Sequence, residues 1–175
     1  MEKIITGKNI SLRLVNIEDA EFIVNLRTKK GEFLSATSPD VDKQKEWLLN
    51  YKTREKLKKE FYFIIENQQN ESIGTVRIYD FKNNISFCWG SWIILNGSPF
   101  YYAIESALLI YEFAFYYLKF QQSHFDVRKN NHSVVKFHLR MGARIIKENE
   151  KDYFFEYNKK EYEAIKNKYI KYLEI

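Results

Sequence analysis

The sequence contains little cysteine and little histidine, and both shortages exclude whole classes of protein. A single cysteine, Cys88, cannot form a disulfide framework, and the first residues, MEKIITGKNISLRL, lack the unbroken apolar stretch of a secretory signal. We therefore expect a cytoplasmic protein. The three histidines stand without a CxxC or HExxH motif, so they form no recognisable metal set. No metal is predicted.

The sequence also lacks a clean membrane span. The segment Phe100–Phe120 is strongly apolar, but it contains Glu105 and Glu112. Each carboxylate would cost roughly 2.5 to 3.5 kcal/mol near the centre of a bilayer. We therefore expect a helix buried in a protein core and no membrane span.

Strong charge of one sign is missing as well. The net charge is +5, and the lysines are dispersed along the chain. The basic runs Lys52–Lys59 and Ile165–Tyr172 both fit helices whose charged side faces solvent. This balance suits an anionic small molecule such as a nucleotide or a pyrophosphate, and no nucleic-acid partner is predicted.

What the sequence does contain is enough for one folded unit. We interpret residues 1–175 as a single domain, because 45% of them are hydrophobic and neither a linker nor a repeat interrupts the chain. Hydrophobic periodicity alternates between strand and helix in a way typical of an α/β or α+β fold, with helices around a mixed sheet. The predicted strands are Ile10–Leu14, Phe61–Ile65, Ile73–Tyr79, Ile85–Leu95, His124–Val127, Arg144–Glu150 and Tyr153–Tyr157. The first predicted helix begins after Asn16 and ends at about Arg27, and a loop is predicted at Gly31–Pro39. The other predicted helices span Val41–Lys59, Tyr101–Leu118, Asn131–Met141 and Lys159–Leu173.

The segment Asn131–Ala143 carries a family resemblance. It is similar to the pattern Asn-x-x-Ala-Ile-x-Leu-Tyr-x-Lys-x-Gly-Phe of the GNAT superfamily of N-acetyltransferases, and the upstream segment Trp89–Leu109 resembles that family's strand, turn and long helix. The resemblance covers nearly the whole chain and is closest to the ribosomal-protein-acetylating branch, which includes amino-sugar acetyltransferases. It implies a GNAT-like, mostly antiparallel central sheet with an extra C-terminal helix. An ordinary amphipathic helix ending at Gly142 would explain the apolar residues without a ligand.

The resemblance implies that acetyl-CoA is the cosubstrate. A helix N-terminus offers unpaired amides and a partial positive charge to a pyrophosphate, so the turn Gly97–Tyr102 is the predicted anion site. The chain departs from the family there, since Ser98, Pro99, Phe100 and Tyr101 stand where glycines are usual. Proline also removes one amide donor. The residues expected to bind the cofactor are Trp92, Ile93, Ile94, Gly97, Ser98, Tyr101, Tyr102, Ala103, Asn131, Val134, Phe137 and Arg140.

The catalytic candidates are His138 and Glu105. His138 occupies the position of the family's tyrosine, which donates a proton to the departing thiolate, and an unperturbed imidazole can carry a proton near pH 6.5. The alternative is a structural histidine held by hydrogen bonds. Glu105 is a candidate general base, or a residue hydrogen-bonded in the core. Cys88 is interpreted as a packed side chain, so we expect direct transfer without an acetylated enzyme.

The front half of the chain is expected to shape the pocket for a small-molecule amine acceptor. An aromatic pocket with an arginine suits a sugar nucleotide, whose base stacks and whose phosphate pairs with guanidinium. Two alternatives stay open, a protein N-terminus as acceptor and a non-catalytic acyl-CoA-binding protein. A homodimer is a further expectation. The predicted acceptor-binding residues are Arg27, Phe33, Trp47, Tyr79 and Trp89.

Overall fold

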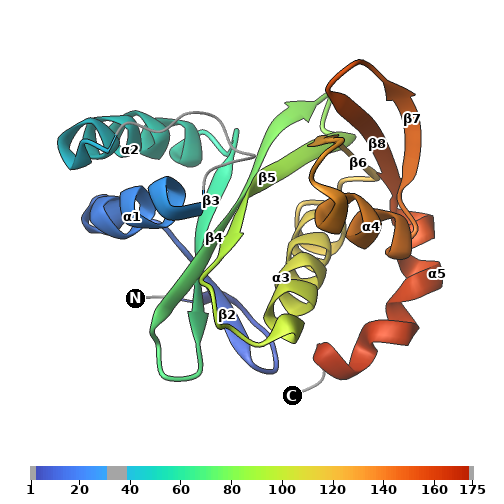
Figure 1. The fold of residues 1–175 in the computed structure, drawn as a ribbon, viewed down its shortest axis with the longest axis horizontal. Helices are drawn as coiled ribbons and strands as arrows, with labels where there is room; N and C mark the ends of the chain where they lie inside the picture. Colours follow the sequence, from blue (N-terminus) through green and yellow to red (C-terminus); the bar gives the residue numbers. More distant parts are fainter. Residues whose placement is uncertain (1–2, 31–38, 174–175) are drawn as a thin grey trace.

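The fold is an eight-stranded mixed sheet with helices on both faces (Figure 1). The computed structural model describes residues 3–30 and 39–173. Along the sheet the strands follow the order β1-β2-β3-β4-β5-β6-β8-β7, and every neighbouring pair except β5–β6 is antiparallel. The strands are β1 (Lys3–Thr6), β2 (Ile10–Leu14), β3 (Phe61–Asn67), β4 (Ser72–Lys82), β5 (Ser86–Ile94), β6 (Gln122–Arg128), β7 (Arg144–Glu148) and β8 (Asp152–Asn158). The α-helices are α1 (Ala20–Lys30), α2 (Val41–Lys56), α3 (Phe100–Glu112), α4 (His132–Arg140) and α5 (Lys159–Tyr169).

The predicted mixed, mostly antiparallel α/β fold is confirmed, with two differences in detail. The strand β1 was not predicted, because a run of four residues is too short to show a period. The long apolar helix ends earlier than predicted: α3 stops at Glu112 and continues as a π-helical turn over Phe113–Tyr117, where the Leu118 amide donates to the Phe113 carbonyl. None of the described helices has both the length and the apolar character needed to cross a bilayer.

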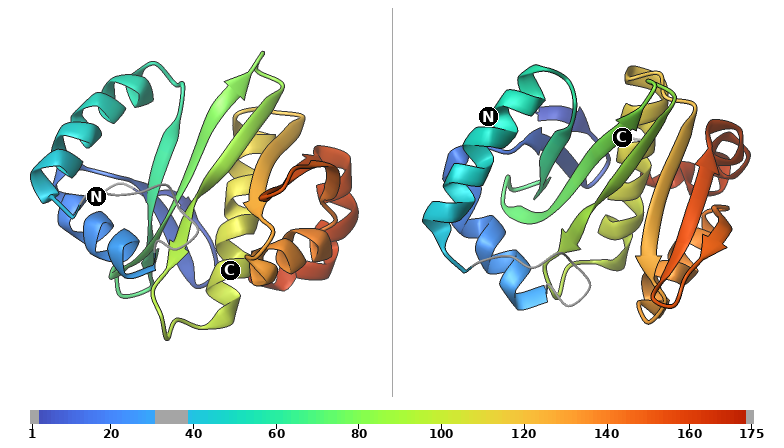
Figure 2. Two further views of the ribbon diagram at one scale, coloured as in Figure 1. Left: turned by 45° about the horizontal axis from the view of Figure 1, so that its top comes forward. Right: turned by 90° about the horizontal axis from the view of Figure 1, so that it is seen from above.

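The two faces of the sheet carry different helices (Figure 2). Along β3, Tyr62 and Ile64 point to α1 and α2, where they pack with Ile23 and Leu48. The alternate residue Phe63 points to the opposite face, in the larger core that includes α3. Because strand side chains alternate between faces, the position of a residue along a strand decides which helices it meets.

The parallel strands β5 and β6 are paired at only two positions. Ser86 pairs with Gln122 and Phe87 with Ser123, and no further pairs follow as the strands diverge (Figure 1). A parallel pair needs a long crossover, which here is α3 on its way from β5 to β6. Beyond these pairs β5 and β6 diverge, and we call the space between them, which is lined by residues of β4, β5, β6 and α4, the notch.

Candidate active site

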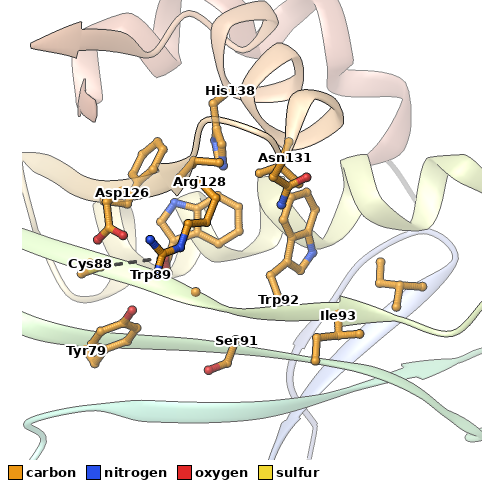
Figure 3. A pocket seen from close by; sticks show the side chains of 15 residues that line it. Tyr79, Cys88, Trp89, Ser91, Trp92, Ile93, Asp126, Arg128, Asn131 and His138 are labelled. Carbon is orange, nitrogen blue, oxygen red and sulfur yellow. Dashed lines mark hydrogen bonds between the residues drawn. The ribbon is translucent and has the colours of Figure 1, made fainter. Parts of the chain in front are cut away.

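The notch contains a pocket of about 530 Å³ (Figure 3). Its walls come from β4, β5, β6 and the first turns of α4. Eight of the residues predicted for cofactor, acceptor or catalysis meet there, although they are spread over about sixty positions of the chain. The residues lining the pocket are Tyr79, Cys88, Trp89, Gly90, Ser91, Trp92, Ile93, Ile94, Phe125, Asp126, Val127, Arg128, Asn131, Val134 and His138.

A β-bulge in β5 forms the floor of the pocket. Between the pairs Thr75–Ile93 and Arg77–Gly90, β5 has one more residue than β4, and Ser91 adopts a left-handed φ of 48°. The Thr75 hydroxyl donates to the Ser91 carbonyl at 2.8 Å, which fixes the bulge from the neighbouring strand. A bulge leaves its extra residue outside the hydrogen-bond ladder. Backbone groups of this stretch are therefore available to a ligand.

Position 74 must be glycine for the two strands to approach this closely. A Cβ atom on Gly74 would lie 2.3 Å from the Ile93 carbonyl oxygen, which no side chain could tolerate without a shift of the backbone. Gly74 thus allows the predicted cofactor strand Trp92–Ile94 to lie directly against β4 beyond the bulge.

The residues that line the notch come from both faces of the sheet, and strand alternation separates its two sides. On β6, Phe125 and Val127 are buried in the α3 core, whereas Asp126 and Arg128 are exposed toward the opposite face. On that opposite face Tyr79 is the register partner of Cys88. One side of the pocket is therefore aromatic and closed by α4, and the other is polar and lies on the side of α1 and α2.

His138 lies on the closed side, 4% exposed, among aromatic rings. Its ring centroid is 4.3 Å from that of Phe125 and 5.3 Å from that of Trp89, and its Nδ1 atom has no hydrogen-bond partner among the described residues. Burial lowers the pKa of His138 to about 3. The ordinary pKa of an unperturbed imidazole therefore does not apply to His138 in the free protein: at neutral pH the ring is uncharged, with one N–H donor and one acceptor nitrogen.

Glu105, a residue of α3, lies outside the pocket. Its fully buried side chain contacts the turn between β1 and β2. Its carboxylate accepts from the backbone amide of Asn9 at 2.7 Å, the Asn9 side chain at 2.8 Å and the amide of Ile10 at 3.1 Å. Gly7 gives it room, since a Cβ there would lie 2.3 Å from Oε1. Of the two predicted roles, the geometry supports the hydrogen-bonded core residue and leaves Glu105 without access to a reacting amine.

The predicted acceptor residues divide into pocket walls and supports. Tyr79 and Trp89 line the pocket, and the Trp89 indole donates to the buried Tyr111 hydroxyl at 3.1 Å. Arg27 lies behind the pocket, where its guanidinium reaches the Ser91 hydroxyl at 3.4 Å. Trp47 lies further back on α2. Phe33 falls outside the described residues.

Trp47 belongs to a column of alternating guanidinium groups and rings. The Arg77 guanidinium lies 5.2 Å from the Trp47 ring centroid and 4.5 Å from that of Tyr79, so it is stacked between the two rings. Glu60, buried at 4% exposure, forms ion pairs with both Arg77 and Arg54. The column thus supports Tyr79 from behind, and Trp47 contributes to the pocket indirectly.

The helix α3 begins beyond the rim of the pocket. Pro99 is its N-cap, with a φ of −54°, so the missing amide lies before the helix and removes none of the helical donors. Gly97, at φ 85°, makes the turn that leads into the helix. The departure from the glycine-rich family pattern therefore leaves the N-terminal amides of α3 in place. The predicted cofactor residues that do not line the pocket are Gly97, Ser98, Tyr101, Tyr102, Ala103, Phe137 and Arg140.

Seven of the residues that line the pocket were not predicted as site residues, among them Ser91, Asp126 and Arg128. Ser91 gave no signal, because nothing in the run SFCWGSWII marks where the extra residue falls. Asp126 and Arg128 could have been found, since they alternate with apolar residues along QSHFDVR and so had to share one face of a strand. Among residues 3–30 and 39–173, no cluster of three or more acidic, histidine or cysteine side chains could hold a metal ion.

Comparisons with known proteins agree with this geometry. The family model for the acetyltransferase (GNAT) domain matches residues 9–144. The solved structure of apo FdhC, described as a nucleotide-linked sugar GNAT, is 44% identical, with a TM-score of 0.89 over 97% of this chain and 98% of that one. A search of curated proteins gave no significant match.

Two more distant structures share the fold alone. A variant spermidine/spermine N-acetyltransferase SpeG from Vibrio cholerae is 17% identical, with a TM-score of 0.73 over 89% of this chain and 96% of that one. The ribosomal-protein-S5-alanine acetyltransferase from Vibrio fischeri is 15% identical, with a TM-score of 0.72 over 88% and 95%. The family model and the match to FdhC together lead to one conclusion: the chain belongs to the GNAT acetyltransferase family and is an acetyl-CoA-dependent N-acetyltransferase.

Proposed function

We propose that the protein transfers the acetyl group of acetyl-CoA directly to the primary amine of a nucleotide-linked amino sugar, as a step in surface-polysaccharide synthesis. The observation that carries the choice of acceptor is the 44% identity to FdhC, a nucleotide-linked sugar GNAT, over nearly the full length of both chains. The pocket supports it, because a cleft with one aromatic side and one polar side can hold the cofactor on one side and the acceptor on the other.

The cofactor fits the side of the notch that faces α3 and α4. We assign the pantetheine arm to the wall made by Trp92, Ile93 and Ile94, opposite Asn131 and Val134. The thioester carbonyl then lies at the bulge, where a backbone amide near Ser91 can stabilise the tetrahedral oxyanion. The pyrophosphate extends beyond the pocket to the amides at the start of α3.

His138 is assigned to the sulfur of the thioester. Its buried, unpartnered Nδ1 lines the pocket, and an orphaned buried polar atom is best explained by a group that arrives with the ligand. As a neutral imidazole it donates a hydrogen bond to the developing thiolate from whichever nitrogen carries the proton. The thiolate's negative charge in turn favours protonation of the ring, so proton transfer becomes easier as the C–S bond breaks.

The proposal is tested first by binding and then by turnover. Acetyl-CoA at 100 times its Kd should add about 2.7 kcal/mol of stability, equivalent to a rise in Tm of about 5 to 10 °C for a chain of this size. Val134→Glu places a charge on the cofactor wall and should abolish the rise, whereas Leu139→Glu, on the exposed side of the same helix, should retain it. Absence of any rise in the unmodified protein would refute cofactor binding.

Release of free thiol with a panel of acceptors then separates the candidate functions. Acetylation of nucleotide-linked amino sugars supports the proposal, and acetylation of peptide N-termini alone supports the ribosomal-protein alternative. Binding of acetyl-CoA without turnover of any acceptor would favour the non-catalytic acyl-CoA-binding alternative. The expected homodimer is tested separately by light scattering.

A further inference from the structure

The outward face of β6 presents two opposite charges to the pocket. Asp126 and Arg128 are both exposed, both line the pocket, and extend into the space in front of Cys88 and the Tyr79 hydroxyl (Figure 3). Residues two apart on one strand face lie about 6.6 to 6.8 Å from each other. None of the functions assigned above uses either charge.

The Asp126 carboxylate is available for a ligand. Within the described part of the chain it makes no hydrogen bond and no ion pair. Burial raises the pKa of Tyr79 and of Cys88, and the nearby charge of Asp126 adds a smaller contribution in the same direction. Arg128 contacts Asp152, to which its guanidinium donates a long hydrogen bond and with which it forms an ion pair, both at 3.4 Å. The titratable and charged groups around Asp126 on this face are Tyr79, Asp80 and Lys82 on β4, Cys88 on β5, His124 and Arg128 on β6, and Asp152 and Glu156 on β8.

We propose that Asp126 and Arg128 form a two-charge acceptor subsite, in which Asp126 binds and deprotonates the acceptor amine and Arg128 binds an anionic group of the same molecule. This inference rests on the proposed function. It places the amine on the polar side of the notch, across the bulge from the cofactor wall. The nitrogen can then approach the thioester carbon from the face opposite His138.

The proton and electron balance of the step is complete with these groups. The acceptor ammonium gives one proton to the Asp126 carboxylate, and the freed nitrogen lone pair forms the N–C bond to the acetyl carbon. The C–S bond of the tetrahedral intermediate breaks and leaves its electron pair on sulfur. The second proton of the nitrogen goes to the thiolate, which the hydrogen bond from His138 stabilises until the proton arrives. Asp126 finally releases its proton to solvent, giving the amide, the free thiol and one proton.

The subsite also defines the chemical class of acceptor. An amino sugar linked to a diphosphate carries a cation and an anion a few bonds apart, which matches a carboxylate beside a guanidinium. A polyamine carries only positive charges, so a second ammonium near Arg128 would be repelled. Spermidine and an alanine-terminated peptide without phosphate are therefore expected to be poor acceptors.

The decisive experiment measures kcat/KM between about pH 6 and pH 9, with a nucleoside-diphosphate amino sugar and with the same amino sugar lacking the nucleotide. Asp126→Asn should lower kcat/KM by about 100-fold or more at neutral pH. The loss should shrink as pH rises, because the amine then arrives already neutral. Asp126→Glu should recover activity to within about tenfold. Glu150→Gln removes an equal charge from an exposed position outside the pocket and should leave the pH profile unchanged.

Arg128→Gln supplies the second arm of the test. It should raise KM about tenfold or more for the nucleotide-linked acceptor and leave that of the free amino sugar unchanged. An Asp126→Asn variant that is fully active, or equally impaired at every pH, overturns the assignment of Asp126. An equal effect of Arg128→Gln on both acceptors overturns that of Arg128. If the unmodified enzyme acetylates no amine, the proposed function fails and the subsite fails with it.

Discussion

The buried imidazole of His138 should make the protein lose stability in mild acid by a calculable amount. Its pKa is lowered from 6.5 to about 3 by burial in the folded state, so the unfolded chain binds a proton that the folded chain does not. The contribution of His138 to stability is full above pH 6.5 and is lost as pH falls toward 3. At pH 5 the loss is about 1.5 pH units times 1.36 kcal/mol, or about 2 kcal/mol.

Urea unfolding followed by tryptophan fluorescence at pH 7 and pH 5 measures this loss. His138→Gln cannot take up the proton, so the stability of the unmodified protein relative to the variant should fall by about 2 kcal/mol between the two pH values. Any fixed cost of the glutamine cancels in the comparison. Leu139→Gln, at an exposed position of the same helix, changes no titratable group, so it is the control and should show no such change. A pH-independent difference between His138→Gln and the unmodified protein would refute a neutral, desolvated imidazole.

Three further predictions concern residues around the pocket. Glu105→Ala should lower the free energy of unfolding by about 3 kcal/mol in urea titrations, because two backbone amides and the Asn9 side chain lose a buried carboxylate, while acceptor KM stays unchanged. Cys88→Ser should retain turnover, and mass spectrometry should detect no acetylated enzyme, because burial raises the pKa of the Cys88 thiol to about 11 and keeps it from acting as a thiolate. Arg77→Met should raise acceptor KM several-fold in steady-state assays with little change in the Kd for acetyl-CoA, because Tyr79 loses the guanidinium stacked behind it.

The parts of the site that local pattern and family resemblance could predict are those built from continuous segments. Asn131, Val134 and His138 follow from one helix with a glycine stop, and the structure brings them opposite the predicted strand Trp92–Ile94. Strand and helix periods are local, so the order of elements was predictable as well.

What could not be predicted depends on partners distant in the chain. Glu105 was a candidate base only because nothing nearby indicates that its partners are Asn9 and Ile10, about 95 residues away. Arg77 likewise gave no sign of its place between Trp47 and Tyr79, which depends on how α2 packs on β4. Desolvation of His138 arises from four separate elements closing around it, so its altered pKa is a property of the assembled core and not of the motif.

The short parallel junction between β5 and β6 has a consequence for how the chain folds. The strands on either side of it form antiparallel pairs, of which β1–β2, β3–β4, β4–β5 and β7–β8 close through short turns, whereas Ser86 and Gln122 meet only after the whole of α3 has crossed the sheet. The short turns carry a smaller loop-closure cost than the contact between Ser86 and Gln122. The walls of the notch come from both sides of this junction, so no hairpin of the sheet can form the site by itself.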